Sequence, residues 1–338
     1  MFKLLQNGIT MPMIGMGTSM LPMDDVTVDL LVTAIKDIGY RHIDTAHCYD
    51  NEHLIGEAIQ RVLSDPEAKI CREDLFITSK INPTMQRPDQ VLKLVRQSLQ
   101  RLRLTYMDCV LIHSPVALKE FDRKTTNPNM PFPVDDSVDY LDTWKELECI
   151  FDAKQVKSIG VSNFNQSQLQ RIISHCRIPP SVLQVECHVH FPQTKLKQFC
   201  DHNNIAMTAY GPLGSPKVSH GRSGRSMTDE ERIAGTLEDP VIISIATRLN
   251  KTPAQICLRW LVERGICPLP KSATPARLAE NFSIFDFEIA QDDMNAISSI
   301  LTIRRIFTFR RCIQSKNFPF SDQLETADTA FVDDNDDQ

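Results

Sequence analysis

Four side chains that can hold or transfer a proton occur between residues 44 and 113: Asp44, Tyr49, Lys80 and His113. A tyrosine has a pKa of about 10 in water, which makes it a poor proton donor at neutral pH. We expect an ammonium group on Lys80 to lower the pKa of Tyr49, and the Asp44 carboxylate to keep that lysine charged. A histidine such as His113 can orient a carbonyl oxygen by hydrogen bonding. Together these residues suit the protonation of a carbonyl oxygen.

The same residue types also have ordinary structural roles. Asp44 could cap a helix, Lys80 could be a solvated loop lysine, and His113 could be a hydrogen-bonded core histidine. No side chain supplies a hydride, so a reduction at this site would require a nicotinamide cofactor. Whether the four residues form a site therefore depends on whether the fold brings them together.

Short apolar segments of strand length alternate with longer amphipathic segments along most of the chain. The strand segments are residues 14–18, 41–44, 75–80, 107–113, 156–163, 183–186, 205–210 and 266–270. The helical segments are residues 26–38, 52–63, 88–102, 138–153, 166–175, 194–203 and 253–264. Repeated strand-then-helix units produce parallel strands joined by crossover connections. The pattern therefore predicts an α/β protein with eight parallel strands.

Two folds arrange such units: a closed barrel and an open, doubly wound sheet. The open sheet would need a Gly-x-Gly-x-x-Gly motif after its first strand. Gly15 and Gly17 fit the start of that motif, but Met20 stands where the third glycine belongs, and no helix pattern begins there. We therefore predict a (β/α)8 TIM barrel with long loops at its C-terminal face. In such a barrel the active site lies at the carboxyl ends of the strands.

Polar residues end or follow seven of the predicted strands, and a barrel would gather them on one face. They are Asp44, Lys80, His113, Asn163, Glu186, Tyr210 and Lys271. This placement favours one site over several unrelated structural roles.

Four segments fall outside the repeating pattern. Residues 2–12 are typical of a β-hairpin that turns at Asn7-Gly8, which we expect to plug the bottom of the barrel. Residues 214–236 form a long loop that we expect to act as a lid, and residues 300–324 form a further segment. We assign residues 1–324 to a single barrel domain. Residues 325–338 hold six acidic and no basic side chains, and we predict that they form a disordered tail.

Composition limits the classes of protein that fit. The formal net charge is −6, and without the acidic tail the body is nearly neutral, which argues against nucleic-acid binding. No apolar stretch reaches the roughly 20 residues of a membrane helix, and the first residues turn polar too soon for a signal peptide. The ten cysteines contain no Cys-x-x-Cys pair and are expected to be free thiols. We therefore expect a cytoplasmic protein without membrane or nucleic-acid partners.

Several motifs resemble those of the aldo-keto reductase family, particularly its aldose and hydroxysteroid reductases. One runs from Gly39 to Ala46 with Tyr49, and a second is Leu111-Ile112-His113. A third is Lys157-Ser158-Ile159-Gly160-Val161-Ser162-Asn163-Phe164, and a fourth runs from Lys271 through Arg277 to Phe282. The resemblance extends from about residue 5 to residue 324. It implies an NADPH-dependent reduction of a small-molecule aldehyde or ketone by a protein that is often monomeric.

The resemblance also implies roles for individual residues. Tyr49 would be the general acid, Asp44 and Lys80 would tune it, and His113 would orient the substrate. The expected cofactor residues are Ser162, Asn163 and Gln184 at the carboxamide, Tyr210 stacked on the nicotinamide ring, Leu213 and Ser215 along the pyrophosphate, Lys271, Ser272 and Arg277 at the 2′-phosphate, Glu280 and Asn281 at adenine, and Thr18. Because a phosphate suits the paired cations of Lys271 and Arg277, we expect NADPH to be preferred over NADH.

The chain departs from the family where tryptophans commonly line the substrate pocket. Ser19, Asn82 and Ser114 stand at those positions. The two tryptophans of the chain, Trp144 and Trp260, fall in predicted helices. Each missing indole removes a large apolar contact. We therefore predict a wider, more polar pocket with weak affinity for flat aromatic aldehydes.

Two other functions are compatible with parts of the sequence. His188 and His190, after Glu186, form a His-x-His pair that could ligate a metal in a TIM-barrel hydrolase. Such a site needs more ligands at other strand ends, where only Asp44 and His113 are available. The chain could also be a non-catalytic NADPH-binding regulatory protein. The complete set of four proton-handling residues favours a reductase without a metal over both.

Overall fold

A computed structural model describes residues 1–121, 127, 130–214 and 235–321 of the chain. Eight parallel strands form one sheet, in which strands that are consecutive along the chain are neighbours in space. They are β3 (Met16–Gly17), β4 (His42–Asp44), β5 (Phe76–Ile81), β6 (Cys109–Ile112), β7 (Ile159–Ser162), β8 (Val182–Glu186), β9 (Ala206–Tyr210) and β10 (Ile266–Pro268).

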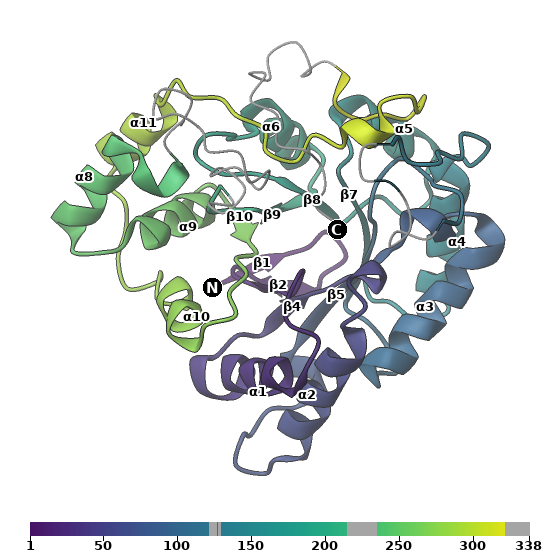
Figure 1. Cartoon of the computed structure of the whole chain (residues 1–338), viewed down its shortest axis with the longest axis horizontal. Helices are drawn as coiled ribbons and strands as arrows, with labels where there is room; N and C mark the ends of the chain where they lie inside the picture. Colours follow the sequence, from purple (N-terminus) through teal and green to yellow (C-terminus); the bar gives the residue numbers. More distant parts are fainter. Residues whose placement is uncertain (122–126, 128–129, 215–234, 322–338) are drawn as a thin grey trace.

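Backbone hydrogen bonds join the two outer strands of this sheet to each other. The N–H of Gly15, next to β3, donates to the carbonyl oxygen of Pro268 in β10 at 3.0 Å. The N–H of Gly17 donates to the carbonyl oxygen of Pro270 at 3.1 Å. A Cβ atom at Gly17 would lie only 3.1 Å from the carbonyl oxygen of Leu269, so this close approach favours glycine. The sheet closes into a barrel (Figure 1), and the predicted (β/α)8 fold is confirmed.

Helices cover the outside of the barrel (Figure 1). Those predicted from the sequence are present as α1 (Asp25–Thr33), α2 (Glu52–Ser64), α3 (Pro88–Leu102), α4 (Tyr140–Asp152), α5 (Gln166–His175), α6 (Thr194–His202) and α9 (Pro253–Glu263). The structure adds α8 (Pro240–Leu249), α10 (Pro275–Phe282) and α11 (Gln291–Ser298), which we did not predict. α8 is ten residues long, and α10 and α11 are eight residues long each.

Local sequence signals set several helix ends. After α1, one further turn, η1 (Ala34–Ile38), ends at Gly39, whose φ of +105° is unfavourable for residues with a Cβ atom. The Asn165 side chain accepts a hydrogen bond from the first turn of α5, as an N-cap should. Pro88 and Pro253 occupy the first turns of α3 and α9, where their missing N–H is not needed.

The predicted N-terminal hairpin is present and lies at the amino ends of the barrel strands. β1 (Phe2–Leu4) pairs with β2 (Thr10–Pro12) in antiparallel fashion. The Gln6 side chain donates a hydrogen bond to the carbonyl oxygen of Pro180, just before β8, at 2.7 Å. The Asn7 side chain donates to the carbonyl oxygen of Lys157, just before β7, at 2.8 Å. These contacts hold the hairpin across the bottom of the barrel (Figure 1).

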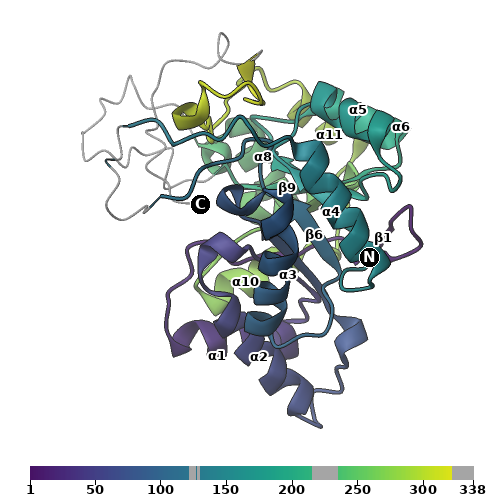
Figure 2. The same cartoon turned by 90° about the vertical axis from the view of Figure 1, so that its right-hand side faces the viewer.

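The C-terminal segment, coloured yellow in Figure 2, lies at the carboxyl side of the barrel and also contacts the start of α5. The Asn165 and Gln168 side chains of α5 donate hydrogen bonds to the carbonyl oxygens of Pro319 and Asn317, at 3.0 and 2.8 Å. Most of the predicted lid, residues 215–234, and the acidic tail, residues 325–338, lie outside the described residues. The assignment of residues 1–324 to a single domain therefore stays a prediction.

Two further expectations concern cysteines and membrane helices. All ten cysteines lie among the described residues and are free thiols, as expected. None of the helices in the described ranges is both long and apolar enough to cross a membrane.

Candidate active site

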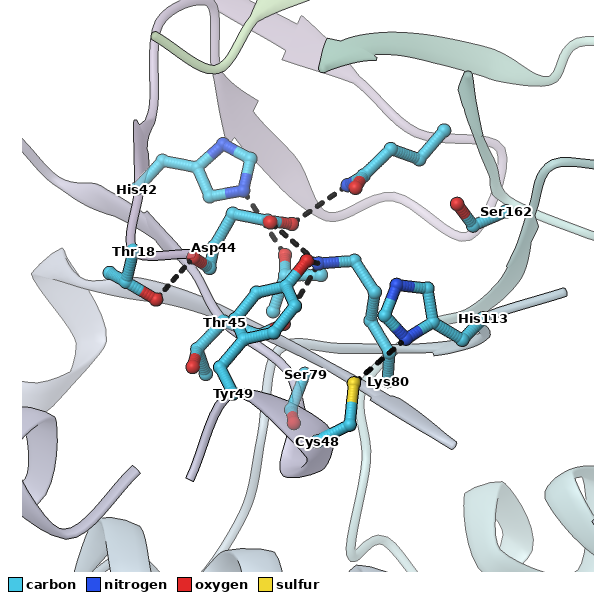
Figure 3. Close-up of polar contacts among 12 residues, drawn as sticks. Thr18, His42, Asp44, Thr45, Cys48, Tyr49, Ser79, Lys80, His113 and Ser162 are labelled. Atoms are coloured by element: carbon cyan, nitrogen blue, oxygen red, sulfur yellow. Dashed lines mark hydrogen bonds and ion pairs between the residues drawn. The ribbon is translucent and has the colours of Figure 1, made fainter. Parts of the chain in front are cut away.

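Three neighbouring strands end in the polar residues from which the predicted site is built. Asp44 is the last residue of β4, Lys80 is the penultimate residue of β5, and His113 follows β6. β5 pairs in parallel with β4 on one side and with β6 on the other, so the three carboxyl ends lie side by side. Tyr49 comes from η2 (His47–Tyr49), a short turn after β4. The fold therefore brings all four residues together, as Figure 3 shows.

The centre of this cluster is a buried ion pair between Asp44 and Lys80. Lys80 Nζ lies 2.6 Å from Asp44 Oδ1 and 2.9 Å from the carbonyl oxygen of Thr45, and the lysine side chain is fully buried. Asp44 Oδ2 accepts a hydrogen bond from Gln184 Nε2 at 2.7 Å. Lys80 Nζ also lies 3.3 Å from the hydroxyl oxygen of Tyr49. Because buried charges need partners, these contacts fix the ammonium group against the phenol.

The Tyr49 hydroxyl is in a different electrostatic state from the one that we expected. Burial of the hydroxyl end raises the pKa of Tyr49 well above its usual value, and the Asp44 carboxylate raises it further. The lowering that we expected from Lys80 is not borne out. The Lys80 ammonium is paired with Asp44 at 2.6 Å, and the effects of burial and of that carboxylate outweigh it at the phenol. Tyr49 therefore stays protonated at neutral pH, the form that a proton donor needs.

His113 faces Tyr49 across the site (Figure 3). The two rings are nearly perpendicular, at 74°, with their centroids 5.8 Å apart. The His113 side chain is buried, and its backbone carbonyl oxygen accepts a hydrogen bond from Asn163 Nδ2 at 2.9 Å. A carbonyl oxygen placed between the phenol and the imidazole could accept a hydrogen bond from each of them.

The residues predicted to hold the nicotinamide lie beside this cluster: Ser162 and Asn163 at the end of β7, Gln184 within β8, and Tyr210 at the end of β9. Asn163 Nδ2 donates to the hydroxyl oxygen of Ser162 at 3.2 Å, and Asn163 Oδ1 accepts from the Tyr210 hydroxyl at 2.8 Å. Gln184 contacts Asp44, as described above. The side-chain amides and hydroxyls of this set match the donors and acceptors of a carboxamide. They are linked by hydrogen bonds to the predicted proton-donating residues.

The predicted cofactor residues at the adenosine end lie around α10. Lys271 and Arg277 are exposed, and a Cβ atom at Gly17 would lie 3.7 Å from the Lys271 Cβ atom, so Lys271 stands next to the end of β3. The Ser272 hydroxyl oxygen accepts the N–H of Thr274 at 3.0 Å. Two exposed cations beside a hydroxyl group suit a phosphate ester.

The remaining predicted cofactor residues vary in their surroundings. Thr18 is buried and its hydroxyl donates to the carbonyl oxygen of Asp44 at 2.9 Å. Glu280 accepts a hydrogen bond from the Thr252 hydroxyl at 2.8 Å, and Asn281 is 4% exposed, which leaves it little surface for adenine. Leu213 is partly buried. Ser215 lies outside the described residues.

The three predicted pocket residues also lie at the carboxyl side of the barrel. Ser19 follows β3, Asn82 follows β5, and Ser114 follows His113. Asn82 Oδ1 accepts the N–H of Thr84 at 3.2 Å, and Ser114 Oγ accepts the N–H of Val116 at 3.1 Å. Asn82 and Ser114 thus stabilise their own loops.

Neither tryptophan replaces the missing aromatic side chains. Trp144 is buried in α4, where its indole N–H donates to the carbonyl oxygen of Ile178 at 3.1 Å. Trp260 is buried in α9, beneath the guanidinium group of Arg264. Both side chains belong to the helical layer outside the barrel strands.

Glu186, at the end of β8, has a role that we did not predict. Its two carboxylate oxygens accept the backbone N–H groups of Ile306 and Phe307, at 2.7 and 3.0 Å. These contacts hold the C-terminal segment over the barrel and place the Phe307 ring 5.3 Å from that of Tyr210. The partners are 120 and 121 residues apart, so no local pattern in the sequence could have revealed the contact.

The predicted alternative of a metal site finds no support in this region. His188 Nε2 lies 3.0 Å from Glu186 Oε1, whereas His190 Nε2 lies 2.9 Å from Asp239 Oδ2. The two histidines therefore contact different carboxylates. Among the described residues there is no group of three or more histidine, cysteine, aspartate or glutamate side chains that could hold a metal ion.

A sequence model described as the aldo/keto reductase family matches residues 13–302, which is most of the barrel. The chain belongs to the aldo/keto reductase family. The resemblance inferred from the sequence motifs is thereby confirmed. The chain is accordingly an oxidoreductase that acts on carbonyl or alcohol groups.

Individual relatives agree with this membership over nearly the full length of the chain. Aldo-keto reductase family 1 member A1-A of Danio rerio is 40% identical over 296 residues, which cover 87% of this chain and 88% of the relative. Prostaglandin F synthase 1 of Bos taurus is 37% identical over 324 residues, covering 94% and 97%. The structure of an aldose reductase from Schistosoma japonicum superposes with a TM-score of 0.85 at 38% identity, covering 96% and 99%.

Proposed function

We propose that this reductase converts an aldehyde or ketone to an alcohol with NADPH as its cofactor and Tyr49 as the proton donor. The observation that carries the proposal is the contact of the Tyr49 hydroxyl with the fully buried Lys80 ammonium, which Asp44 holds in place. NADPH, when bound, supplies the hydride that no side chain can provide. The family relationship supports carbonyl chemistry at this site.

The chain's own residues would bind NADPH at both of its ends. Ser162, Asn163 and Gln184 would hold the carboxamide, and Tyr210 would lie against the nicotinamide ring. Thr18, Leu213 and Ser215 would line the middle, with Ser215 outside the described residues. The groups assigned to the adenosine end are Lys271, Ser272, Arg277, Glu280 and Asn281. The exposed cations among them support a preference for the 2′-phosphate of NADPH.

Proton transfer would take place at the Tyr49 hydroxyl. The raised pKa keeps Tyr49 protonated, and the carbonyl oxygen would accept hydrogen bonds from Tyr49 and His113. As negative charge develops on the carbonyl oxygen, that oxygen becomes far more basic than a phenolate and takes the Tyr49 proton. The phenolate left behind lies 3.3 Å from Lys80 Nζ, which stabilises it until it is protonated again.

The same reasoning extends to the substrate and the cellular setting. We propose a small-molecule carbonyl substrate in a wide, polar pocket bordered by Ser19, Asn82 and Ser114. Ten free thiols fit a reducing compartment, which supports a cytoplasmic location. We also propose that the protein acts as a monomer, without membrane or nucleic-acid partners.

An activity screen separates this proposal from a non-catalytic NADPH-binding protein. The full-length protein is incubated with NADPH and, in turn, short aldehydes, dicarbonyls, sugars and steroid ketones, and the loss of NADPH absorbance is followed. Turnover of at least one class that depends on the Tyr49 hydroxyl is expected. NADPH binding without turnover of any class would favour the regulatory alternative.

The cofactor assignment has its own test. In Arg277→Ala, the affinity for NADPH should fall by roughly tenfold or more, because a charge-assisted contact to the 2′-phosphate is lost. The affinity for NADH, measured in parallel by fluorescence titration, should not change. An unchanged ratio of the two affinities would refute the role of Arg277.

A further inference from the structure

Cys48 places a thiol against the imidazole of His113. Cys48 directly precedes Tyr49 in the η2 turn, and its Sγ atom lies 3.5 Å from His113 Nδ1. Figure 3 shows that the other ring nitrogen of His113 points toward the Tyr49 hydroxyl and the Lys80 ammonium. His113 Nδ1 thus contacts the Cys48 sulfur, and Nε2 is directed toward Tyr49 and Lys80.

The direction of the Cys48–His113 hydrogen bond determines what His113 can do. A neutral imidazole carries one N–H group and one bare nitrogen, and only the N–H can donate to a carbonyl oxygen. If Nδ1 carries the hydrogen and donates to sulfur, Nε2 is bare and cannot orient a carbonyl. If the thiol donates to Nδ1, the hydrogen lies on Nε2 and is available to the substrate.

Acidity decides between the two arrangements. A thiol is a much stronger acid than the N–H of a neutral imidazole, and an imidazole nitrogen is a much stronger base than a thiol sulfur. A hydrogen bond between these groups is therefore favourable with sulfur as the donor and nitrogen as the acceptor. The contact to Cys48 selects the imidazole form that has its hydrogen on Nε2.

We propose that Cys48 is a positioning residue, which fixes His113 in the tautomer that donates a hydrogen bond to the substrate carbonyl. This inference rests on the proposed function, because it gives His113 the task of orienting a carbonyl oxygen. Cys48 and Tyr49 are consecutive residues in one turn. That turn therefore holds the proton donor and also sets the hydrogen-bonding state of the group across from it.

The tautomer of His113 can be measured directly. Full-length protein with ¹⁵N-labelled histidine is studied by two-bond ¹H–¹⁵N correlation at about pH 7.5, where an ordinary imidazole is mostly neutral and an ordinary thiol is mostly protonated. His113→Gln identifies the His113 signals by their disappearance. In the wild type, Nδ1 should have the ¹⁵N chemical shift of an unprotonated ring nitrogen, and Nε2 should have that of a protonated one. In Cys48→Ala, both shifts should move toward the average of the two tautomers.

Kinetics then connect the tautomer to the reaction. Cys48→Ala should lower kcat/KM for a carbonyl substrate about three- to tenfold, because one weak hydrogen bond is lost. Cys48→Ser keeps a donor, although its oxygen sits closer to the backbone, and should recover the wild-type tautomer and most of kcat/KM. Cys149→Ala, which removes an exposed thiol on α4, is the matched control and should leave both readouts unchanged.

The outcomes separate this inference from the proposed function. Absence of carbonyl reduction by the wild type would overturn the proposed function, whatever the tautomer. Reduction by the wild type, together with an unchanged tautomer and an unchanged kcat/KM in Cys48→Ala, would overturn only the role of Cys48. A wild-type His113 with its hydrogen on Nδ1 would overturn the role of Cys48 as well.

Discussion

The two ends of the barrel each bury an aspartate beside a cation and a tyrosine, but the groups meet differently. At the carboxyl ends of the strands, Lys80 Nζ lies 2.6 Å from Asp44 and 3.3 Å from the Tyr49 hydroxyl oxygen. The cation therefore contacts the part of the tyrosine that can release a proton. We refer to Asp44, Tyr49 and Lys80 as the upper cluster.

The corresponding groups at the amino ends form what we refer to as the lower cluster: Arg72, Tyr106, Asp108 and Lys157. Asp108 pairs with Arg72 at 2.6 Å and with Lys157 at 3.4 Å. Both cations lie over the Tyr106 ring, 4.1 and 3.9 Å from its centroid. The Tyr106 hydroxyl is buried without a hydrogen-bond partner among the described residues.

This difference teaches that composition alone does not make a site. In the lower cluster the cations stabilise the electron-rich ring face, an interaction that strengthens the fold. In the upper cluster we propose that the ammonium stabilises the charge that would appear on the phenol oxygen during proton transfer. In barrels of this kind the active site lies at the carboxyl ends of the strands, whereas the amino ends contribute to stability. We expect the two clusters to follow that division.

Removing the two tyrosine hydroxyls should separate the clusters most sharply. We expect Tyr49→Phe to lower kcat/KM by about 10²- to 10⁴-fold, because the general acid is lost. Tyr106→Phe should leave kcat/KM unchanged and the free energy of unfolding equal or slightly higher, because an unpaired buried hydroxyl is removed. Steady-state kinetics and urea unfolding measure both variants. Equal losses of kcat/KM in the two would show that the clusters do not differ in function.

Removing one cation from each cluster is the next largest change. Lys80→Met leaves the Asp44 carboxylate buried with only the Gln184 amide on its side chain, and should cost about 3–5 kcal/mol in the free energy of unfolding. Arg72→Met should cost less, about 1–3 kcal/mol, because Asp108 keeps Lys157 and the N–H of Ile77. Urea unfolding gives both values.

The same two variants should differ in activity. Lys80→Met should lose most of its kcat/KM, measured well below its unfolding midpoint, whereas Arg72→Met should retain it. A loss of kcat/KM in Arg72→Met without unfolding would mean that the lower cluster takes part in function.

The sequence predicted Asp44 and Lys80 of the upper cluster, and the neighbouring His113, because simple periodicity locates strand ends. Tyr49 lies in a turn after β4 and was predicted from its chemistry and from the family motif. Asp44, Lys80 and His113 each close an apolar segment, and parallel strands bring such residues to one edge. Asn163 was singled out in the same way, whereas Gln184 was predicted only from the resemblance to the family. The role of both residues in cofactor binding stays a prediction. The position of a residue along a strand can be read from the local sequence. The parallel pairing of the strands then places residues at equivalent positions next to one another.

What the sequence did not predict depends on contacts between distant segments. Burial of the hydroxyl raises the pKa of Tyr49 and the Asp44 carboxylate raises it further, and both effects depend on how distant segments pack around the phenol. The hydrogen bond from the N–H of Ile306 to the Glu186 carboxylate joins residues 120 positions apart in the sequence.

His42, between the two clusters on β4, should make stability depend on pH. Burial lowers the pKa of His42 to about 4, so the folded state keeps it neutral while the unfolded state binds a proton below about pH 6.5. Stability from this group is complete above pH 6.5 and falls as the pH drops toward 4, by roughly 3 kcal/mol in all.

The His42 effect can be separated from the titration of carboxylates by comparing slopes. The free energy of unfolding is measured from pH 7.5 to pH 4.5 for the wild type and for His42→Asn. The variant should lose less stability over this range, whatever its absolute stability. Parallel curves for the two proteins would exclude His42 as the source of the pH dependence.

The smallest expected effect concerns the polar rim beside the upper cluster. Ser114 follows β6, the strand that Asp108 of the lower cluster precedes, and its hydroxyl accepts only a local backbone N–H in the structure described. Ser114→Trp should lower KM for a benzaldehyde-type substrate about two- to tenfold, because an indole adds an aromatic contact. Ser114→Ala is the control, since it removes the local hydrogen bond without adding a ring. A lower KM for the aldehyde in the tryptophan variant alone, with KM for NADPH constant in both variants, would support the prediction. The absence of a tryptophan at position 114 would then account for weak binding of flat aromatic aldehydes. An unchanged KM in Ser114→Trp would mean that an aromatic side chain at position 114 does not contact the substrate. Phe307, whose ring contacts that of Tyr210, would then be the next residue to substitute.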